Sequence, residues 1–178
     1  MAKTKGSQEI ERRFLLEELP TLPILKTAKM LNYKTIYVYT DDPELRLRRV
    51  FQPAKPELGF RFSMTIKFGE GIERGEYPTP IGKKLFKEGT EKYPHQVEKI
   101  RYKRANESDG LLWEIDHFTH LKGLAVPRRK SLFLAEIELD GPNQMFNIPG
   151  WLKIRKEVTN DLRYSNKNIA VYGIPVED

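Results

Sequence analysis

Short segments in which charged and apolar residues alternate recur along this chain, and they limit its possible folds more than any other feature. The first covers residues 9–15. Successive side chains of a β-strand point to opposite faces, so a strand here would place Glu9, Glu11 and Arg13 on one face. Such a face is costly to bury unless something compensates its charges.

Six further segments repeat the alternation. Their charged or polar faces carry Arg46 and Arg48; Ser63, Thr65 and Lys67; Arg74 and Glu76; Lys99, Arg101 and Lys103; Glu114 and Asp116; and Glu136 and Glu138. An antiparallel sheet with one face in water would also alternate. Here, however, acidic pairs and basic pairs occupy different segments, and like charges that share a face repel one another. This sorting favours a ligand between the strands.

Turn signals between these segments predict about eight strands, mostly joined as hairpins. We expect strands over residues 9–15, 34–40, 44–51, 60–68, 72–77, 96–104, 111–118 and 132–139, and short helices over 20–29, 80–90 and 166–171, with another beginning at 149–151. The predicted fold class is therefore mainly β (α+β), with a few short flanking helices, and strands at this spacing favour an antiparallel barrel or sandwich.

A closed barrel of about eight strands is wide enough to hold one small ligand. If the charged faces point inward, the basic strands would bind phosphoryl oxygens, arginine in a bidentate manner. The acidic pairs would hold Mg²⁺ or Mn²⁺, which prefer carboxylate oxygen and water. Opposite charges would offset the cost of burying one another.

Length and charge agree with this reading. The 178 residues suit one domain, which we expect over residues 9–178 after a flexible leader over 1–8. The net charge of +6 suits a polyanionic partner such as nucleic acid, a nucleotide or a phosphate chain, and the expected partner here is a small polyanion, a triphosphate-like molecule. Basic residues interleaved with acidic pairs argue against nucleic acid, because duplex binding favours an exposed basic stripe.

The absence of cysteine excludes disulfides, thiolate metal sites and a cysteine nucleophile. There is no run of about 18 apolar residues and no apolar segment near the first residue. We therefore expect a cytoplasmic protein without a membrane partner, as a monomer or homodimer. The three histidines, His95, His117 and His120, are expected to be structural or solvated.

Taken in order, the charged segments resemble the CYTH superfamily, the triphosphate tunnel metalloenzymes. Residues 9–13 match its Glu-x-Glu-x-Lys strand, 46–48 its Arg-x-Arg strand, 65–69 its Thr-x-Lys strand and Gly turn, 74–76 its Arg-x-Glu, 99–102 its Lys-x-Arg-Tyr, and 113–116 and 135–139 its late acidic strands. The tail over 149–152 and 157–166 is similar to the short, single-domain bacterial branch, which is inorganic triphosphatase-like. The resemblance covers residues 9–170.

The resemblance implies an eight-stranded antiparallel closed tunnel barrel. It also implies a divalent-metal-dependent triphosphatase, most simply one that converts inorganic tripolyphosphate into pyrophosphate and phosphate. It implies Glu9, Glu11, Glu136 and Glu138 as metal ligands, and Arg13, Arg46, Arg48, Lys67, Arg74, Lys99 and Arg101 as the phosphate-binding set. Arg13, Glu76, Glu114 and Asp116 would be catalytic, the carboxylates by supporting a second metal or orienting water.

Two positions depart from the family pattern. Arg13 stands where the family has lysine, and arginine retains its proton, so phosphate binding is kept while any role for a neutral amine is lost. Pro78 replaces the second glutamate of the family's Arg-x-Glu-x-Glu strand. Alternative functions are a class IV-like adenylate cyclase, a thiamine or nucleoside triphosphatase, and a non-catalytic polyphosphate-binding module.

Overall fold

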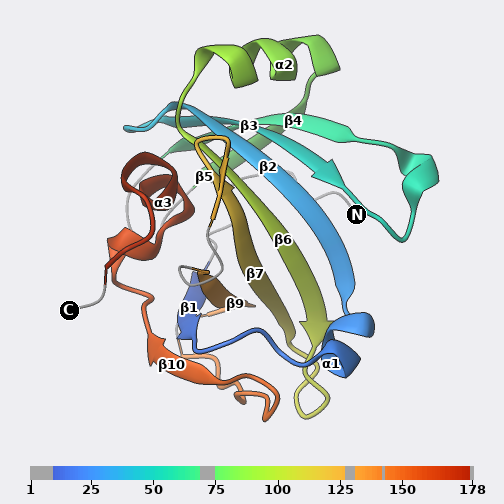
Figure 1. The fold of residues 1–178 in the computed structure, drawn as a ribbon. Helices are drawn as coiled ribbons and strands as arrows, with labels where there is room; N and C mark the ends of the chain where they lie inside the picture. The colour runs from blue at the N-terminus through green and yellow to red at the C-terminus, as the bar shows by residue number, and fades with distance from the viewer. Residues whose placement is uncertain (1–9, 69–74, 127–130, 142, 177–178) are drawn as a thin grey trace.

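The computed structural model describes residues 10–68, 75–126, 131–141 and 143–176, and shows one large curved antiparallel sheet (Figure 1). Its strands are β1 (Ile10–Leu16), β2 (Lys29–Tyr39), β3 (Glu44–Phe51), β4 (Arg61–Phe68), β5 (Gly75–Pro80), β6 (Gln96–Ala105), β7 (Leu112–Leu121), β8 (Leu124–Ala125), β9 (Phe133–Leu139) and β10 (Ile154–Glu157). The helices are α1 (Leu22–Lys26), α2 (Lys83–Lys92) and α3 (Asn166–Tyr172), with 3₁₀ turns that include Pro56–Leu58 and Leu162–Tyr164.

Each of the eight predicted strands has a counterpart among the described residues, and two more strands join them. Residue 9 and residues 72–74 of the predicted strands lie outside the described part of the chain. The sheet order is β10-β1-β9-β7-β6-β2-β3-β4-β5, with the short β8 paired to β7. Residues 149–151, where we expected a helix to begin, form a turn that leads into β10. β5 extends to Pro80, so α2 begins at Lys83 rather than at the proline.

A closed eight-stranded barrel is not confirmed, because the described sheet is open and has ten strands. β10 pairs with β1 at Phe14–Leu16 and so occupies the edge that a closing strand would need there. At the other end, β5 carries Pro78 and Pro80. Proline has no backbone N–H to donate to a neighbouring strand and is tolerated at sheet edges. β5 is therefore a poor template for closure.

The strand register places the charged segments on one face of the sheet. Residues directly opposite one another on paired strands share a face. The pairs Arg13–Glu136, Glu136–Glu114, Asp116–Arg101, Lys99–Tyr33, Thr35–Arg48 and Arg46–Thr65 run in sequence across the sheet from β1 to β4. We call this side the charged face and the opposite side the apolar face.

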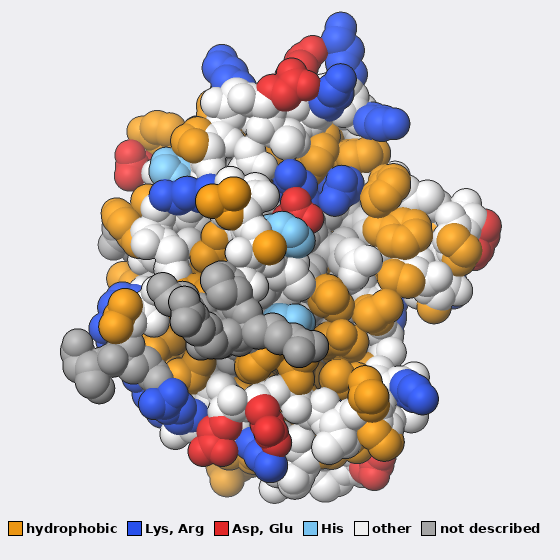
Figure 2. Space-filling view, viewed as in Figure 1, with side chains coloured by type: hydrophobic (Ala, Val, Ile, Leu, Met, Phe, Trp, Pro, Cys, Tyr) orange, Lys and Arg blue, Asp and Glu red, His pale blue; other side chains and the backbone are white. Residues whose placement is uncertain are grey.

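Most of the core lies on the apolar face. α2 packs there through Phe86 against Ile36 and Leu47. Gly89 allows this close approach, because a Cβ at that position would lie 2.5 Å from the Cδ1 atom of Leu47. A second cluster surrounds Trp113 and is covered by the chain leading to β10. Figure 2 shows, on the surface seen from the same side, basic and acidic side chains at the top of the molecule, where Figure 1 places α2.

The third apolar cluster lies at one end of the charged face. Side chains of the sheet, among them Tyr37, Phe118 and Leu134, contact Ile169 and Ala170 of α3 there. α3 begins after Ser165, whose hydroxyl accepts a hydrogen bond of 3.1 Å from the backbone N–H of Asn168. α3 therefore covers one end of the charged face. None of the helices in the described part of the chain has the length and apolar character needed to cross a bilayer.

We expect Ile169→Ala to lower the free energy of unfolding by about 2–5 kcal/mol, because the side chain of Ile169 is fully buried where α3 packs on the sheet. Urea unfolding measures this loss. Leu162→Ala is the control, since Leu162 is 66% exposed, and its effect should stay within about 0.5 kcal/mol. Equal losses in the two variants would contradict the docking of α3 as part of the folded core.

Candidate active site

Arg101 is the centre of a buried ion network on the charged face. Its Nε donates to Oδ1 of Asp116 at 2.6 Å, and its Nη2 donates to Oε2 of Glu136 at 2.6 Å. Its Nη1 also pairs with Glu114. Burial lowers the pKa of Arg101, but the charges of Asp116 and Glu136 outweigh this effect and raise its pKa overall. One guanidinium thus joins carboxylates of β7 and β9.

Glu136 is held between two arginines. Its Oε1 accepts a hydrogen bond of 2.8 Å from Nε of Arg13, while its Oε2 faces Arg101. Burial raises the pKa of Glu136, but Arg101 and Arg13 outweigh it, so the pKa lies below its usual range. Glu136 is therefore an anion at neutral pH, although its side chain is only 7% exposed.

Lys99 adds a cation beside Asp116. Its ammonium pairs with the Asp116 carboxylate and donates to Oδ1 of Asn166 at 2.8 Å. Burial, and then the nearby charge of Arg101, lower the pKa of Lys99 to about 8, against the opposing effect of Asp116. Asn166 is the first residue of α3, so the helix contributes a polar ligand to the charged face.

The cations of β3 have a different environment. The Arg48 guanidinium lies over the ring of Tyr33, 5.4 Å from its centroid, and within the described residues its buried Nε has no hydrogen-bond partner. Burial, together with repulsion from Arg46, lowers the pKa of Arg48 to about 10. Arg46 is buried and lies 3.7 Å from Glu44. Net positive charge therefore gathers on this side of the sheet.

The other site candidates lie outside the ion network around Arg101, or outside the residues that the structure describes. Glu138 is exposed and lies opposite Glu11 in the β1–β9 register. Lys67 is partly buried and pairs in register with Glu44 and with Glu76. Glu9 and Arg74 lie outside the described residues. The remaining candidates of β1, β3, β6, β7 and β9 share the charged face.

Sequence reasoning missed some side chains that support the site. Tyr33 lies under both Arg48 and Arg101, with distances of 5.4 Å and 5.7 Å from the guanidinium carbons to its ring centroid. The predicted strand began one residue too late to include it, since β2 starts at Lys29. Asn166 carries no local signal, because its partner Lys99 is 67 positions away.

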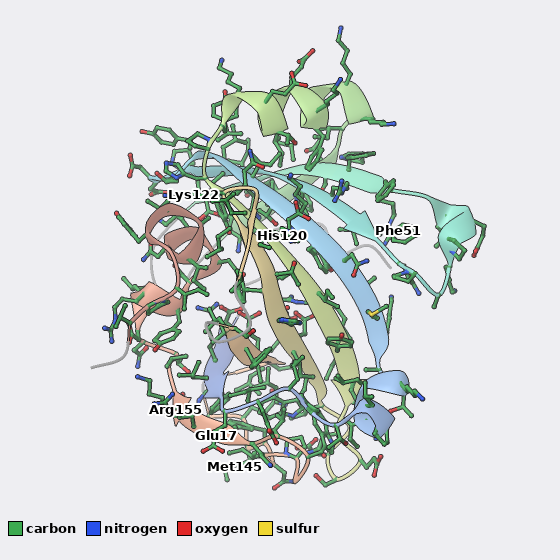
Figure 3. All side chains as sticks on the ribbon, viewed as in Figure 1. Glu17, Phe51, His120, Lys122, Met145 and Arg155 are labelled. Carbon is green, nitrogen blue, oxygen red and sulfur yellow. The ribbon has the colours of Figure 1, made fainter. Side chains whose placement is uncertain are left out.

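The two histidines of β7 lie on the apolar face of the sheet rather than among the charged side chains. His117 lies opposite Ile100 on the apolar face, and its ring packs on Phe133 with centroids 5.0 Å apart. His120, labelled in Figure 3, lies opposite Glu98 on the same face. His95 precedes β6.

The donor chemistry of the acidic side fits a divalent cation. Glu11, Glu136 and Glu138 provide carboxylates on two adjacent strands of the charged face. Burial, and then repulsion from Glu136, raise the pKa of Glu11, so a cation between them would be favourable. The described acidic and histidine side chains include no group of three arranged as a complete ligand set, and Glu136 is engaged by arginines. Binding would therefore require these carboxylates to move.

Comparison with known proteins gives close relatives over almost the whole chain. An inorganic triphosphatase of Nitrosomonas europaea is 34% identical over 169 residues, 92% of this chain and 97% of that protein. An inorganic triphosphatase of Acetivibrio thermocellus is 32% identical over 168 residues, 92% of this chain and 93% of that protein.

Structural comparison agrees. The crystal structure of an inorganic triphosphatase superposes with a TM-score of 0.62 at 29% sequence identity, and the match covers 97% of this chain and 98% of that protein. No family model matches the chain. The two sequence relatives, together with the charged strands that follow one another along the chain, show that this chain belongs to the inorganic triphosphatase family within the CYTH superfamily.

Proposed function

We propose that this protein hydrolyses inorganic tripolyphosphate to pyrophosphate and phosphate, with a divalent cation bound on the acidic side of the charged face. The observation that carries the proposal is the division of one face into a cationic side on β3 and an acidic side on β1, β7 and β9. The names of the relatives give the same reaction class.

The cationic side suits the phosphate chain. Burial and the charge of Arg46 lower the pKa of Arg48, so an anion beside the two guanidiniums would relieve an unfavourable charge state. Phosphate oxygens accept two parallel hydrogen bonds from arginine, which fixes their orientation. Lys67, Arg74 and Lys99 would extend this contact, and Tyr33 would hold Arg48 in place.

The acidic side suits the metal, for which we propose Glu9, Glu11, Glu136 and Glu138 as ligands and Mg²⁺ or Mn²⁺ as the ion. When bound, the ion neutralises phosphate charge and lowers the pKa of a bound water. The protein's own contribution is position and charge, which dominate phosphoryl transfer. Arg101 and Arg13 would stabilise negative charge on the transferred group, and Glu114, Asp116 and Glu76 would orient the attacking water.

The proposal includes closure of the sheet into a tunnel around the bound substrate. A metal–triphosphate complex has both signs of charge, so it would draw the cationic and acidic sides of the face toward one another. We also propose that residues 9–178 form one domain that follows a leader over residues 1–8. The protein would act in the cytoplasm as a monomer or homodimer.

The direct test is phosphate release from tripolyphosphate, ATP and pyrophosphate with Mg²⁺ or Mn²⁺. We expect release from tripolyphosphate to be fastest, and chelation by EDTA to abolish it. Preference for ATP would assign a nucleoside triphosphatase, and formation of cyclic AMP from ATP would assign a cyclase. Tripolyphosphate binding without release would leave a polyphosphate-binding module.

We expect Glu136→Gln to reduce metal-dependent hydrolysis at least about 100-fold, because it removes a proposed ligand charge while keeping the side-chain shape. Glu157→Gln is the matched control, since Glu157 also pairs with an arginine, Arg12, away from the charged face. Steady-state rates and thermal unfolding should be measured on both. Unchanged activity in a folded Glu136→Gln protein would remove Glu136 from the ligand set.

Tripolyphosphate binding should weaken as the pH rises through about 8, because Lys99 loses its charge there. The stability of the fold should not decrease over this range. The pKa of Lys99 in the folded protein lies below the 10.5 of an unperturbed lysine, so between these two values the unfolded chain binds more protons and stability rises with pH. Asn166→Asp should move the weakening to a pH at least about one unit higher, because it adds a carboxylate beside the ammonium. Affinity measured from pH 6.5 to 10 checks this.

Asn160→Asp is the control, because it adds the same negative charge at an exposed position. It should leave the pH dependence as in the wild type. If Asn166→Asp also leaves it unchanged, Lys99 does not control the alkaline loss of binding.

A further inference from the structure

Arg13 lies between the carboxylates proposed as metal ligands. Its Nε donates to Oε1 of Glu136 at 2.8 Å, and its Nη2 pairs with Glu11. Its side chain is 11% exposed, whereas that of Glu11 is 42% exposed. The guanidinium is therefore inserted below Glu11, between the two acidic side chains.

These contacts use the oxygens that a cation would need. One oxygen of Glu136 accepts from Arg13 and the other from Arg101, so a metal at either oxygen would have a guanidinium as its immediate neighbour. A divalent ion shared by Glu11 and Glu136 would also lie beside the Arg13 guanidinium. Like charges repel strongly where water is largely excluded, so the ion and the guanidinium compete for the same place.

We propose that Arg13 is an internal counter-ion that a divalent metal must displace, and that it thereby sets the metal affinity of the protein. This rests on the proposed metal site but not on the identity of the substrate. Arginine is well suited to the role because its planar fork can engage two carboxylates at once. A lysine holds the same charge on a single nitrogen and would be displaced more easily.

Displacement gives the guanidinium a second role. Once released from Glu11 and Glu136, Arg13 would remain on the charged face, where a bound phosphate chain would offer it new acceptor oxygens. Metal and tripolyphosphate then assist each other, because the ion frees a cation that the phosphate binds. By linkage, tripolyphosphate must raise metal affinity by the same factor as the metal raises tripolyphosphate affinity.

The adjacent Arg12 shows what a merely structural pair looks like. Its guanidinium pairs with Glu157, with Nε 2.7 Å from Oε1, and lies near the rings of Phe14 and Phe146. Arg12 thus holds β1 to β10 on the opposite side of the strand from Arg13. The two arginines are neighbours with the same type of partner, which makes Arg12 a matched control.

The experiment is a titration of the full chain with Mn²⁺ alone. Binding is measured by calorimetry and by the electron paramagnetic resonance signal of free Mn²⁺. We expect Arg13→Lys to lower the dissociation constant for Mn²⁺ about fivefold to tenfold, and Arg13→Gln to lower it at least as much. Arg12→Lys should leave it within about twofold of the wild-type value. Thermal unfolding verifies that each variant is folded.

A folded Arg13→Lys protein that binds Mn²⁺ no more tightly than the wild type would overturn the proposal, as would equal gains in Arg13→Lys and Arg12→Lys. Repeating the titration with tripolyphosphate tests the coupling, which should be smaller in Arg13→Gln than in the wild type. Since the first titration contains no substrate, it can succeed even if hydrolysis is not observed, so the two proposals fail separately.

Discussion

The structure depends on the ion network around Arg101. Burying charges is costly, and the cost is offset only when each charge has a well-placed partner. Arg101 meets this condition through Asp116 and Glu136, which come from neighbouring strands, with two donor–acceptor distances of 2.6 Å. The network therefore requires β6, β7 and β9 to lie side by side in one register. A slip by one residue would turn these charges to the apolar face.

This requirement also explains how the core is divided. Apolar side chains cannot fill the middle of the charged face, so two of the three core clusters lie on the other face. The third lies at the end of the charged face, where α3 covers it. The same helix supplies Asn166 to Lys99 and, through Lys167, a hydrogen bond of 2.8 Å to the carbonyl oxygen of Thr40. Core and site are thus joined through α3.

Alternation in the sequence was sufficient to predict the eight main strands and which residues share a face, because both depend on neighbours two positions apart. It could not predict pairing between distant residues. Arg13 and Glu136 are 123 positions apart, and their ion pair becomes visible only with the β1–β9 register. β10 was missed because its four residues are too few to show a period. Closure is not confirmed in the described sheet, and alternation could not decide it because it says nothing about strand edges.

The two departures from the family pattern have a common electrostatic consequence. Pro78 leaves β5 with one carboxylate fewer, so acidic charge is concentrated on β1, β7 and β9, far from β5 in the sheet order. Arg13 lies within that acidic region and neutralises the charges of Glu11 and Glu136 through two contacts at once, which a lysine with its single nitrogen would do less firmly. Separation of charge across the face favours a bridging metal–phosphate complex, whereas the arginine resists the metal alone. Together they favour a protein that binds metal and triphosphate jointly rather than metal first.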